Sequence, residues 1–260
     1  MVPEELEAGG VRLPVHVAEA PRRAQRGRST TRRTARTARA ARATLGPNGL
    51  SIRLPPSVDA AERERQVAHL LRWARRAVSR DPERFRLRPP RHYRDGDALV
   101  AAGRRFCLEV SHADRRTGAA ELVGDRLRLV LPAADGAGER RHRAGLLVSG
   151  VLAGELEGHL LELCARLHRE HFADVAAPKR VRFRFTTRRW GSCSASGHLS
   201  ISTRLLLAPP RMLEYVCVHE LAHLVHLDHS PRFWRRVAAA SPAFRESERW
   251  LQRHAYDCQF

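Results

Sequence analysis

Two histidines and a glutamate at helical spacing are the residues of this sequence whose types and positions could do chemistry together. His219, Glu220 and His223 lie in the run Val218–Leu224, which has the sequence VHELAHL. Residues four apart share one face of a helix, so His219 and His223 can bind one zinc ion from the same side. Zinc lowers the pKa of a bound water, and Glu220 can accept the proton of that water as it attacks a polarised carbonyl. The pattern therefore predicts a metal-dependent hydrolase with metalloprotease chemistry.

A catalytic zinc site usually has three protein ligands, so a third ligand is expected close to the two histidines. The candidates that follow them are His226, Asp228 and His229. If the helix simply continued, His226 would lie about 10 Å further along its axis than His219. His229 is better placed, because Ser230-Pro231 is typical of the start of a new helix, and the turn before it can bring His229 back over the metal.

The helix that carries these residues is apolar around nearly its whole circumference, which is typical of a helix in a protein core. Two histidines and a glutamate in such a helix need either a metal or hydrogen-bonding partners. The alternative to a metal site is thus a buried helix whose histidines pair with other polar groups. The apolar residues are Val216, Val218, Leu221, Ala222, Leu224 and Val225.

Several short motifs around this helix resemble the YgjP-like zinc metallopeptidase domain, a minigluzincin type that is related to the SprT-like proteases. The resemblance is dense from about Arg180 to Trp234 and weaker back towards residue 50. The motifs are Arg189–Cys193 (RWGSC), Ala208–Pro210 (APP), His219–His223 (HELAH), His229–Pro231 (HSP) and Phe233-Trp234.

The resemblance implies a small gluzincin-like α+β domain in which helices pack beside a short antiparallel sheet. It implies one zinc ion per chain on His219, His223 and His229, with Glu220 as the general base. The substrate would be a peptide or a protein, and nothing in the motifs indicates which. Imidazole sites also suit other first-row metals, so the metal used in the cell stays open.

A predicted hairpin lies immediately before the histidine helix. Arg180–Phe185 alternates apolar and cationic residues as a half-buried strand does, and Ser194–Gly197 can turn the chain into a second strand, Leu199–Ser202. A strand edge beside the metal could hold an extended peptide by backbone pairing. The residues of this hairpin that we predict to bind substrate are Arg189, Trp190 and Gly191.

The segment 49–135 is predicted to form a small α+β module that precedes the metallopeptidase domain. Leu50–Leu54 alternates as a short strand, and Asp59 is typical of the residue that caps the start of a helix. The runs 106–110 and 127–131 have the composition of strands. No catalytic set of residues is recognisable in this module.

A stretch rich in glycine and alanine, Ala133–Gly138, marks the start of the predicted metallopeptidase domain, residues 136–260. Leucines at helical spacing predict a helix over roughly 139–172 that packs against the histidine helix. Two further helices are predicted to begin at Ser230 and at Ser241.

Residues 1–48 are predicted to be a basic, poorly ordered segment. The chain has a formal net charge of +19, and no acidic residue lies between Glu19 and Asp59. The arginines in this interval could bind the phosphates of a nucleic acid, and the alternative is a solvated basic segment without a partner. They are Arg22, Arg23, Arg26, Arg28, Arg32, Arg33, Arg36, Arg39 and Arg42.

Other functions remain open beside the peptidase. The basic segment would suit a SprT-like protease that acts on proteins associated with nucleic acid. A metal-dependent endoribonuclease of the rRNA-maturation family would have the same three-histidine spacing. The motif of that family resembles H-G-x-x-H, however, with a glycine at the position that Glu220 occupies here. A zinc-stabilised binding module without turnover is a further alternative.

A cytoplasmic protein without membrane association is expected. No run of about 18 apolar residues is present, and the N-terminus lacks the apolar core of a signal peptide. The five cysteines form no C-x-x-C pair, as expected for reduced thiols. The oligomeric state is not indicated by the sequence.

Overall fold

The computed structural model divides the chain into two compact units, Met1–Pro89 and Pro90–Phe260. The residues that it describes are 3–19, 41–46, 48–56, 58–86 and 91–260. Most of the predicted nucleic-acid segment lies outside the described residues, so that partner stays a prediction.

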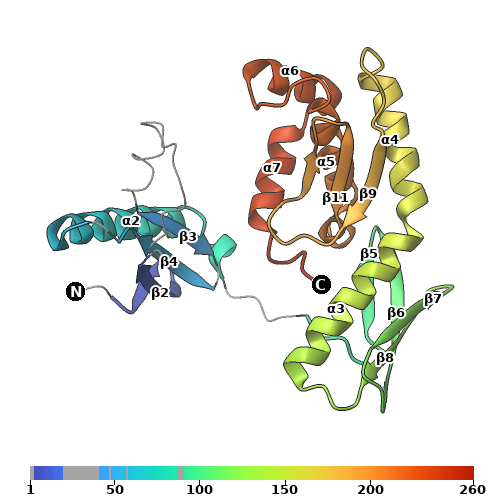
Figure 1. The fold of residues 1–260 in the computed structure, drawn as a ribbon, viewed down its shortest axis with the longest axis horizontal. Helices are drawn as coiled ribbons and strands as arrows, with labels where there is room; N and C mark the ends of the chain where they lie inside the picture. Colours follow the sequence, from blue (N-terminus) through green and yellow to red (C-terminus); the bar gives the residue numbers. More distant parts are fainter. Residues whose placement is uncertain (1–2, 20–40, 47, 57, 87–90) are drawn as a thin grey trace, which may run out of the picture. The chain divides into compact units, whose positions relative to one another are not determined.

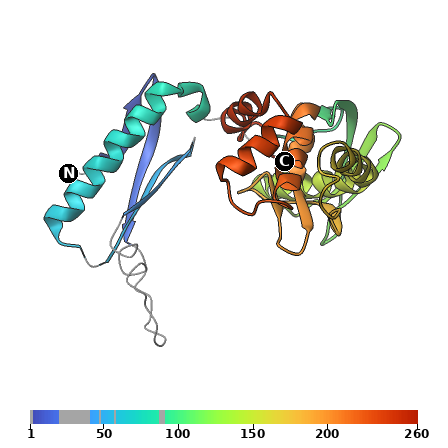
Figure 2. The ribbon, with the colours of Figure 1, turned by 90° about the horizontal axis from the view of Figure 1, so that it is seen from above.

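The first unit is a four-stranded sheet with one helix along one face (Figure 2). Its elements are β1 (Glu5–Ala8), β2 (Val11–Glu19), β3 (Arg42–Gly46), β4 (Gly49–Leu54), α2 (Ala60–Arg80) and a 3-10 helix, η1 (Pro82–Phe85). The strand order is β1-β2-β4-β3, and only the β2–β4 pair is parallel. Asp59 caps α2 as predicted, because its Oδ1 accepts a hydrogen bond from the Glu62 backbone N–H at 2.8 Å. The helix packs on the sheet through Val67, Ala74 and Val78.

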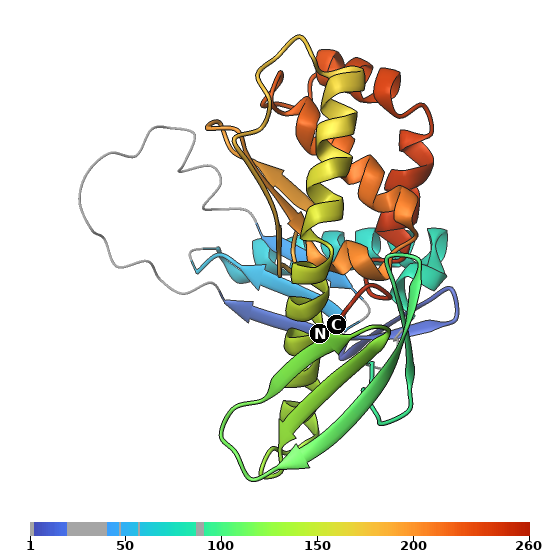
Figure 3. The same cartoon turned by 90° about the vertical axis from the view of Figure 1, so that its right-hand side faces the viewer.

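The second unit begins with another four-stranded sheet, which α3 covers on one face (Figure 3). Its elements are β5 (Ala98–Ala101), β6 (Arg104–Ala113), β7 (Ala119–Val123), β8 (Arg126–Pro132) and α3 (Ala137–Glu155). The strand order is β5-β6-β8-β7, with β6 and β8 parallel. Alternate residues of β8, namely Leu127, Leu129 and Leu131, are buried in one apolar cluster with Val148 and Leu152 of α3.

The domain boundaries predicted from the sequence, at residues 48 and 135, differ from the boundary in the structure. The packing of the strands on the helices explains the difference. Strands β5–β8 bury their leucines against α3, so they belong with the C-terminal residues rather than with a module over 49–135. Strands β1–β3, in contrast, complete the sheet on which α2 packs. The boundary therefore falls near residue 89, between two separately buried cores.

The rest of the second unit surrounds the histidine helix. Its elements are α4 (Glu157–His171), β9 (Arg180–Arg184), β10 (Gly191–Cys193), β11 (His198–Ser202), η2 (Thr203–Leu207), α5 (Pro210–Ala222), α6 (Pro231–Ala240) and α7 (Phe244–Arg253). The histidine helix is α5, which lies against β10 and β11 and is packed by α4, α6 and α7 (Figure 1). Pro210 occupies its first turn, where no backbone N–H is needed. The predicted α+β class is confirmed, but the sheets are mixed rather than antiparallel, because β9 and β11 pair in parallel, as do β6 and β8.

The helix predicted over 139–172 is in fact two helices, α3 and α4, bent by 54° at Leu156. Gly154 and Gly158 flank the bend, and glycine favours the helical conformation less than other residues do. The two halves also pack in different cores, α3 against the β5–β8 sheet and α4 against α5. Within the described residues, no single helix is long and apolar enough to cross a membrane, and only this bent pair meets that criterion together.

The predicted hairpin between residues 180–185 and 199–202 is wrong in its pairing. Strand β9 pairs with β11 in parallel, and the antiparallel partner of β11 is the short strand β10. The turn at 194–197 is as predicted, with Gly197 at a φ of 77°. Residues 185–190 lead the chain from β9 round to the other side of β11, so β10 becomes the edge strand that lies against α5.

Candidate metal centre

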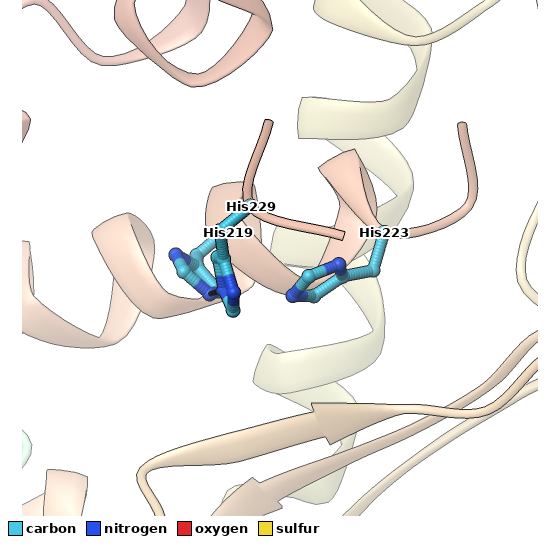
Figure 4. A group of neighbouring side chains, drawn as sticks. All are labelled: His219, His223 and His229. Carbon is cyan, nitrogen blue, oxygen red and sulfur yellow. Dashed lines mark hydrogen bonds between the residues drawn. The ribbon is translucent and has the colours of Figure 1, made fainter. Parts of the chain in front are cut away.

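Three histidines from the end of α5 and the following loop come together at one point (Figure 4). His219 is in the last turn of α5, His223 is the residue that caps its C-terminus, and His229 lies just before α6. One ligand atom of each lies within 4.8 Å of the others, and the Nε2 atoms of His219 and His229 are 3.1 Å apart. Of the three predicted candidates for the third ligand, His229 is the one in this cluster.

Burial favours the neutral, metal-binding form of two of these imidazoles, those of His219 and His223. Burial lowers the pKa of His219 to about 3, and the neighbouring charges of His223 and His229 act in the same direction. Burial also lowers the pKa of His223. The Nδ1–H of His223 donates to the backbone carbonyl of His226 at 2.9 Å, which leaves Nε2 as the unprotonated nitrogen.

Aromatic rings of α6 hold the histidines in place. Phe233 stacks on His223 with ring centroids 4.5 Å apart and meets His219 edge-on at 4.9 Å. Trp234 stacks on His229 at 5.7 Å. Because α6 begins at the predicted Ser230-Pro231 step, these two rings face back over the end of α5.

The carboxylate of Glu220 is buried beside the cluster, with the residue only 5% exposed. Burial raises its pKa to about 7, although the charge of Arg189 and the backbone of Cys193 lower it. In the described part of the chain, Oε2 of Glu220 has no hydrogen-bond partner. A buried carboxylate oxygen without a partner is rare in proteins, and here it indicates a place for a water or substrate group. The donor set and this orphaned oxygen together fit a divalent metal with an adjacent base.

Gly191 of β10 allows the strand to approach Glu220 closely. A Cβ atom at this position would lie 2.6 Å from Oε1 of Glu220 and 2.7 Å from its Cγ. Any other residue would therefore displace the carboxylate. Of the other two residues predicted to bind substrate, Trp190 is half-buried and Arg189 is exposed.

Arg204, which no sequence motif singled out, supports the segment that leads to Gly191. The guanidinium is buried, lies 4.3 Å over the ring of Trp190 and donates to the backbone carbonyl of Thr187 at 3.0 Å. It also donates to the carbonyls of Ala255 and Cys258. Arg204 thus joins the C-terminal residues to the strand beside Glu220.

A pocket of about 240 Å³ opens beside the histidine cluster. It includes Tyr215, one turn before His219, and Glu248 of α7, both of which sequence reasoning missed. Tyr215 carries a weak signal, because its spacing of four places it on the face of His219. Glu248 carries none, since only tertiary packing brings α7 to this site.

The sequence matches the family model described as YgjP-like, metallopeptidase domain, over residues 39–254. This range includes the three histidines, Glu220 and β10. Among solved structures, the chain is similar to the metallopeptidase zymogen of Pyrococcus abyssi abylysin, with 24% identity, 35% of this chain and 91% of that chain covered, and a TM-score of 0.32. No curated protein matches the sequence.

Proposed function

Since the chain belongs to the YgjP-like metallopeptidase family, we propose that it is a peptidase with one zinc ion per chain. His219, His223 and His229 would hold the metal, and Glu220 would be the general base. The observation that carries the proposal is the convergence of these imidazoles within 4.8 Å, beside a buried carboxylate with an unpartnered oxygen.

The proposed reaction divides the work between the metal and the chain. When bound, zinc supplies Lewis-acid chemistry, polarising the scissile carbonyl and making water a better nucleophile at neutral pH. Glu220 accepts a proton from the attacking water and delivers it to the leaving amine nitrogen. Its raised pKa suits both steps, because a group that titrates near 7 can take up and release a proton near neutral pH.

Strand β10 is the proposed binding edge for the substrate. One side of β10 pairs with β11, and within the described residues no strand pairs with its other side. An extended peptide added along this edge would run past Gly191, where the absence of a side chain lets Glu220 reach the scissile bond. Arg189 is exposed, and its charge is close enough to Glu220 to lower the pKa of the Glu220 carboxyl, so we assign Arg189 to the binding of substrate beside this edge.

The test of the proposal is hydrolysis of a diverse peptide library by zinc-loaded protein, read by mass spectrometry. Cleavage is expected to stop when a chelator removes the metal and to return when zinc is added back. A structured RNA incubated under the same conditions is expected to stay intact. Cleaved RNA with intact peptides would overturn the proposal in favour of the endoribonuclease.

Gly191→Ala is expected to lower kcat/KM for peptides roughly 100-fold with the zinc content unchanged, because moving a catalytic group by about an ångström has an effect of this size. The three atoms nearest to the added Cβ all belong to the Glu220 side chain, so the substitution would displace this carboxylate. Ser192→Ala is the matched control, since successive side chains of a strand point to opposite faces. Full activity of Gly191→Ala would show that the close approach of β10 to Glu220 is irrelevant to catalysis.

A further inference from the structure

The pocket beside the histidine cluster has the position of a binding site for a substrate side chain. Its volume is about 240 Å³, and it opens between β10, α5 and α7. Two of its lining residues belong to the proposed catalytic machinery, so a side chain in the pocket would lie next to the reacting bond. The lining residues that matter here are Trp190, Gly191, Tyr215, His219, Glu220 and Glu248.

The pocket has both apolar and polar lining residues, and one carboxylate besides Glu220 lines it. Trp190, Tyr215 and Leu251 supply the apolar surface. Glu248 of α7 is half-buried, and its negative charge adds to burial in raising the pKa of the Tyr215 hydroxyl. The carboxylate therefore lies close to the aromatic wall.

Glu248 differs from the acidic residues of this chain that form ion pairs with arginines. Acidic residues such as Glu109, Asp135 and Glu214 form ion pairs with arginines. In the part of the chain that the structure describes, no arginine, lysine or histidine forms an ion pair with Glu248, although the chain has 47 lysines and arginines in total. A cation on the ligand would offset the partial desolvation of such a half-buried carboxylate.

We infer that this pocket binds an arginine or lysine side chain of the peptide substrate, with Glu248 as the ion-pair partner that determines specificity. The inference rests on the proposed peptidase function. The apolar and aromatic walls fit the methylene stem of such a side chain, and the charged end would meet Glu248. Gln252, one turn further along α7, adds a polar group to the same wall.

The direction of β10 assigns the side of the bond on which the basic residue lies. The pocket is at Gly191, where β10 begins, whereas a separate pocket at the turn 194–197 is lined by His223. The histidine cluster thus lies between the two pockets. A peptide that pairs antiparallel with β10 would place its C-terminal side at Gly191, so the basic residue follows the cleaved bond.

The test compares matched peptides that carry either arginine or its neutral isostere citrulline immediately after the cleaved bond. The arginine peptide is expected to have a kcat/KM roughly 10-fold higher, as for a partly desolvated charge pair. Glu248→Gln is expected to remove this difference, and Glu248→Lys to reverse the charge preference. Glu246→Gln is the control, because Glu246 is exposed on the same helix and does not line the pocket.

A binding measurement separates failure of this inference from failure of the proposed function. Fluorescent versions of the two peptides would be titrated into zinc-loaded Glu220→Gln protein, with and without Glu248→Gln. Tighter binding of the arginine peptide that depends on Glu248 would support the inference even if no peptide were hydrolysed. Equal hydrolysis or equal binding of the two peptides would overturn it, while hydrolysis of both would leave the peptidase function standing.

Discussion

Glu220→Gln is expected to retain zinc and to lose about a thousandfold in kcat/KM for peptides, since general base catalysis contributes roughly 10²- to 10⁴-fold. The amide keeps the shape of the carboxylate but cannot accept a proton from water at neutral pH. Because Glu220 is not in the cluster of histidines that would hold the metal, binding of zinc should be preserved. Peptide kinetics and elemental mass spectrometry on the same samples measure both effects.

The folded state of Glu220→Gln should be at least as stable as that of the native protein. A buried carboxylate with an unpartnered oxygen opposes folding, and its replacement by a neutral amide removes the buried charge. Thermal unfolding of the metal-free proteins therefore checks that lost activity is not lost structure. Glu214→Gln is the matched control on the same helix, where the native carboxylate pairs with Arg166 at the surface. Turnover at the native rate by Glu220→Gln would remove Glu220 from the mechanism.

His229→Ala is expected to reduce zinc from near one per chain to a small fraction of that and to abolish peptide hydrolysis. Loss of a partner that only orients a metal ligand weakens binding by about 10- to 100-fold, so loss of a ligand itself should exceed the upper figure. His229 is exposed in the loop before α6, so its removal leaves the core around α5 intact. The metal content per chain and the zinc affinity measure the effect.

The control for His229→Ala is His226→Ala. His226 contacts His223 through its backbone carbonyl, which alanine also supplies, so this variant should keep its zinc. Zinc should also raise the unfolding temperature of the native protein and of His226→Ala, but not that of His229→Ala. Full zinc binding by His229→Ala would contradict the three-histidine site, and no zinc in metal-replete native protein would make the cluster structural.

Local spacing accounts for what could be predicted of the site. Residues four apart lie on one helical face in any fold, so the proximity of His219 and His223 followed from the sequence. The start of α6 at Ser230-Pro231 and the cap of α2 at Asp59 likewise depend on neighbouring residues. The third ligand could not be chosen from spacing alone, because His226, Asp228 and His229 were all candidates. The turn between α5 and α6 brings His229 to the other two histidines.

Strand pairing and domain division could not be predicted in the same way. The alternation of residues 180–185 predicted a strand, which β9 confirms. Alternation does not specify which strand pairs with it, or whether the pairing is parallel or antiparallel. The leucines of β8 are buried against α3, and their spacing within the strand does not specify which helix covers them. Strand pairing and domain division depend on contacts between segments that are distant in the sequence, and local periodicity carries no information about these contacts.

The sequence by itself determined the α+β class, the helix that carries His219, Glu220 and His223, and the metallopeptidase resemblance, because each depends on residues close together in the chain. Only the tertiary structure decided that Gly191 touches Glu220, that Arg204 holds the segment beside it, and that Glu248 faces the same pocket. These contacts join residues that are far apart in the chain. Burial of the apolar core around α5 brings these residues together, and no pattern within a single segment of the sequence predicts it.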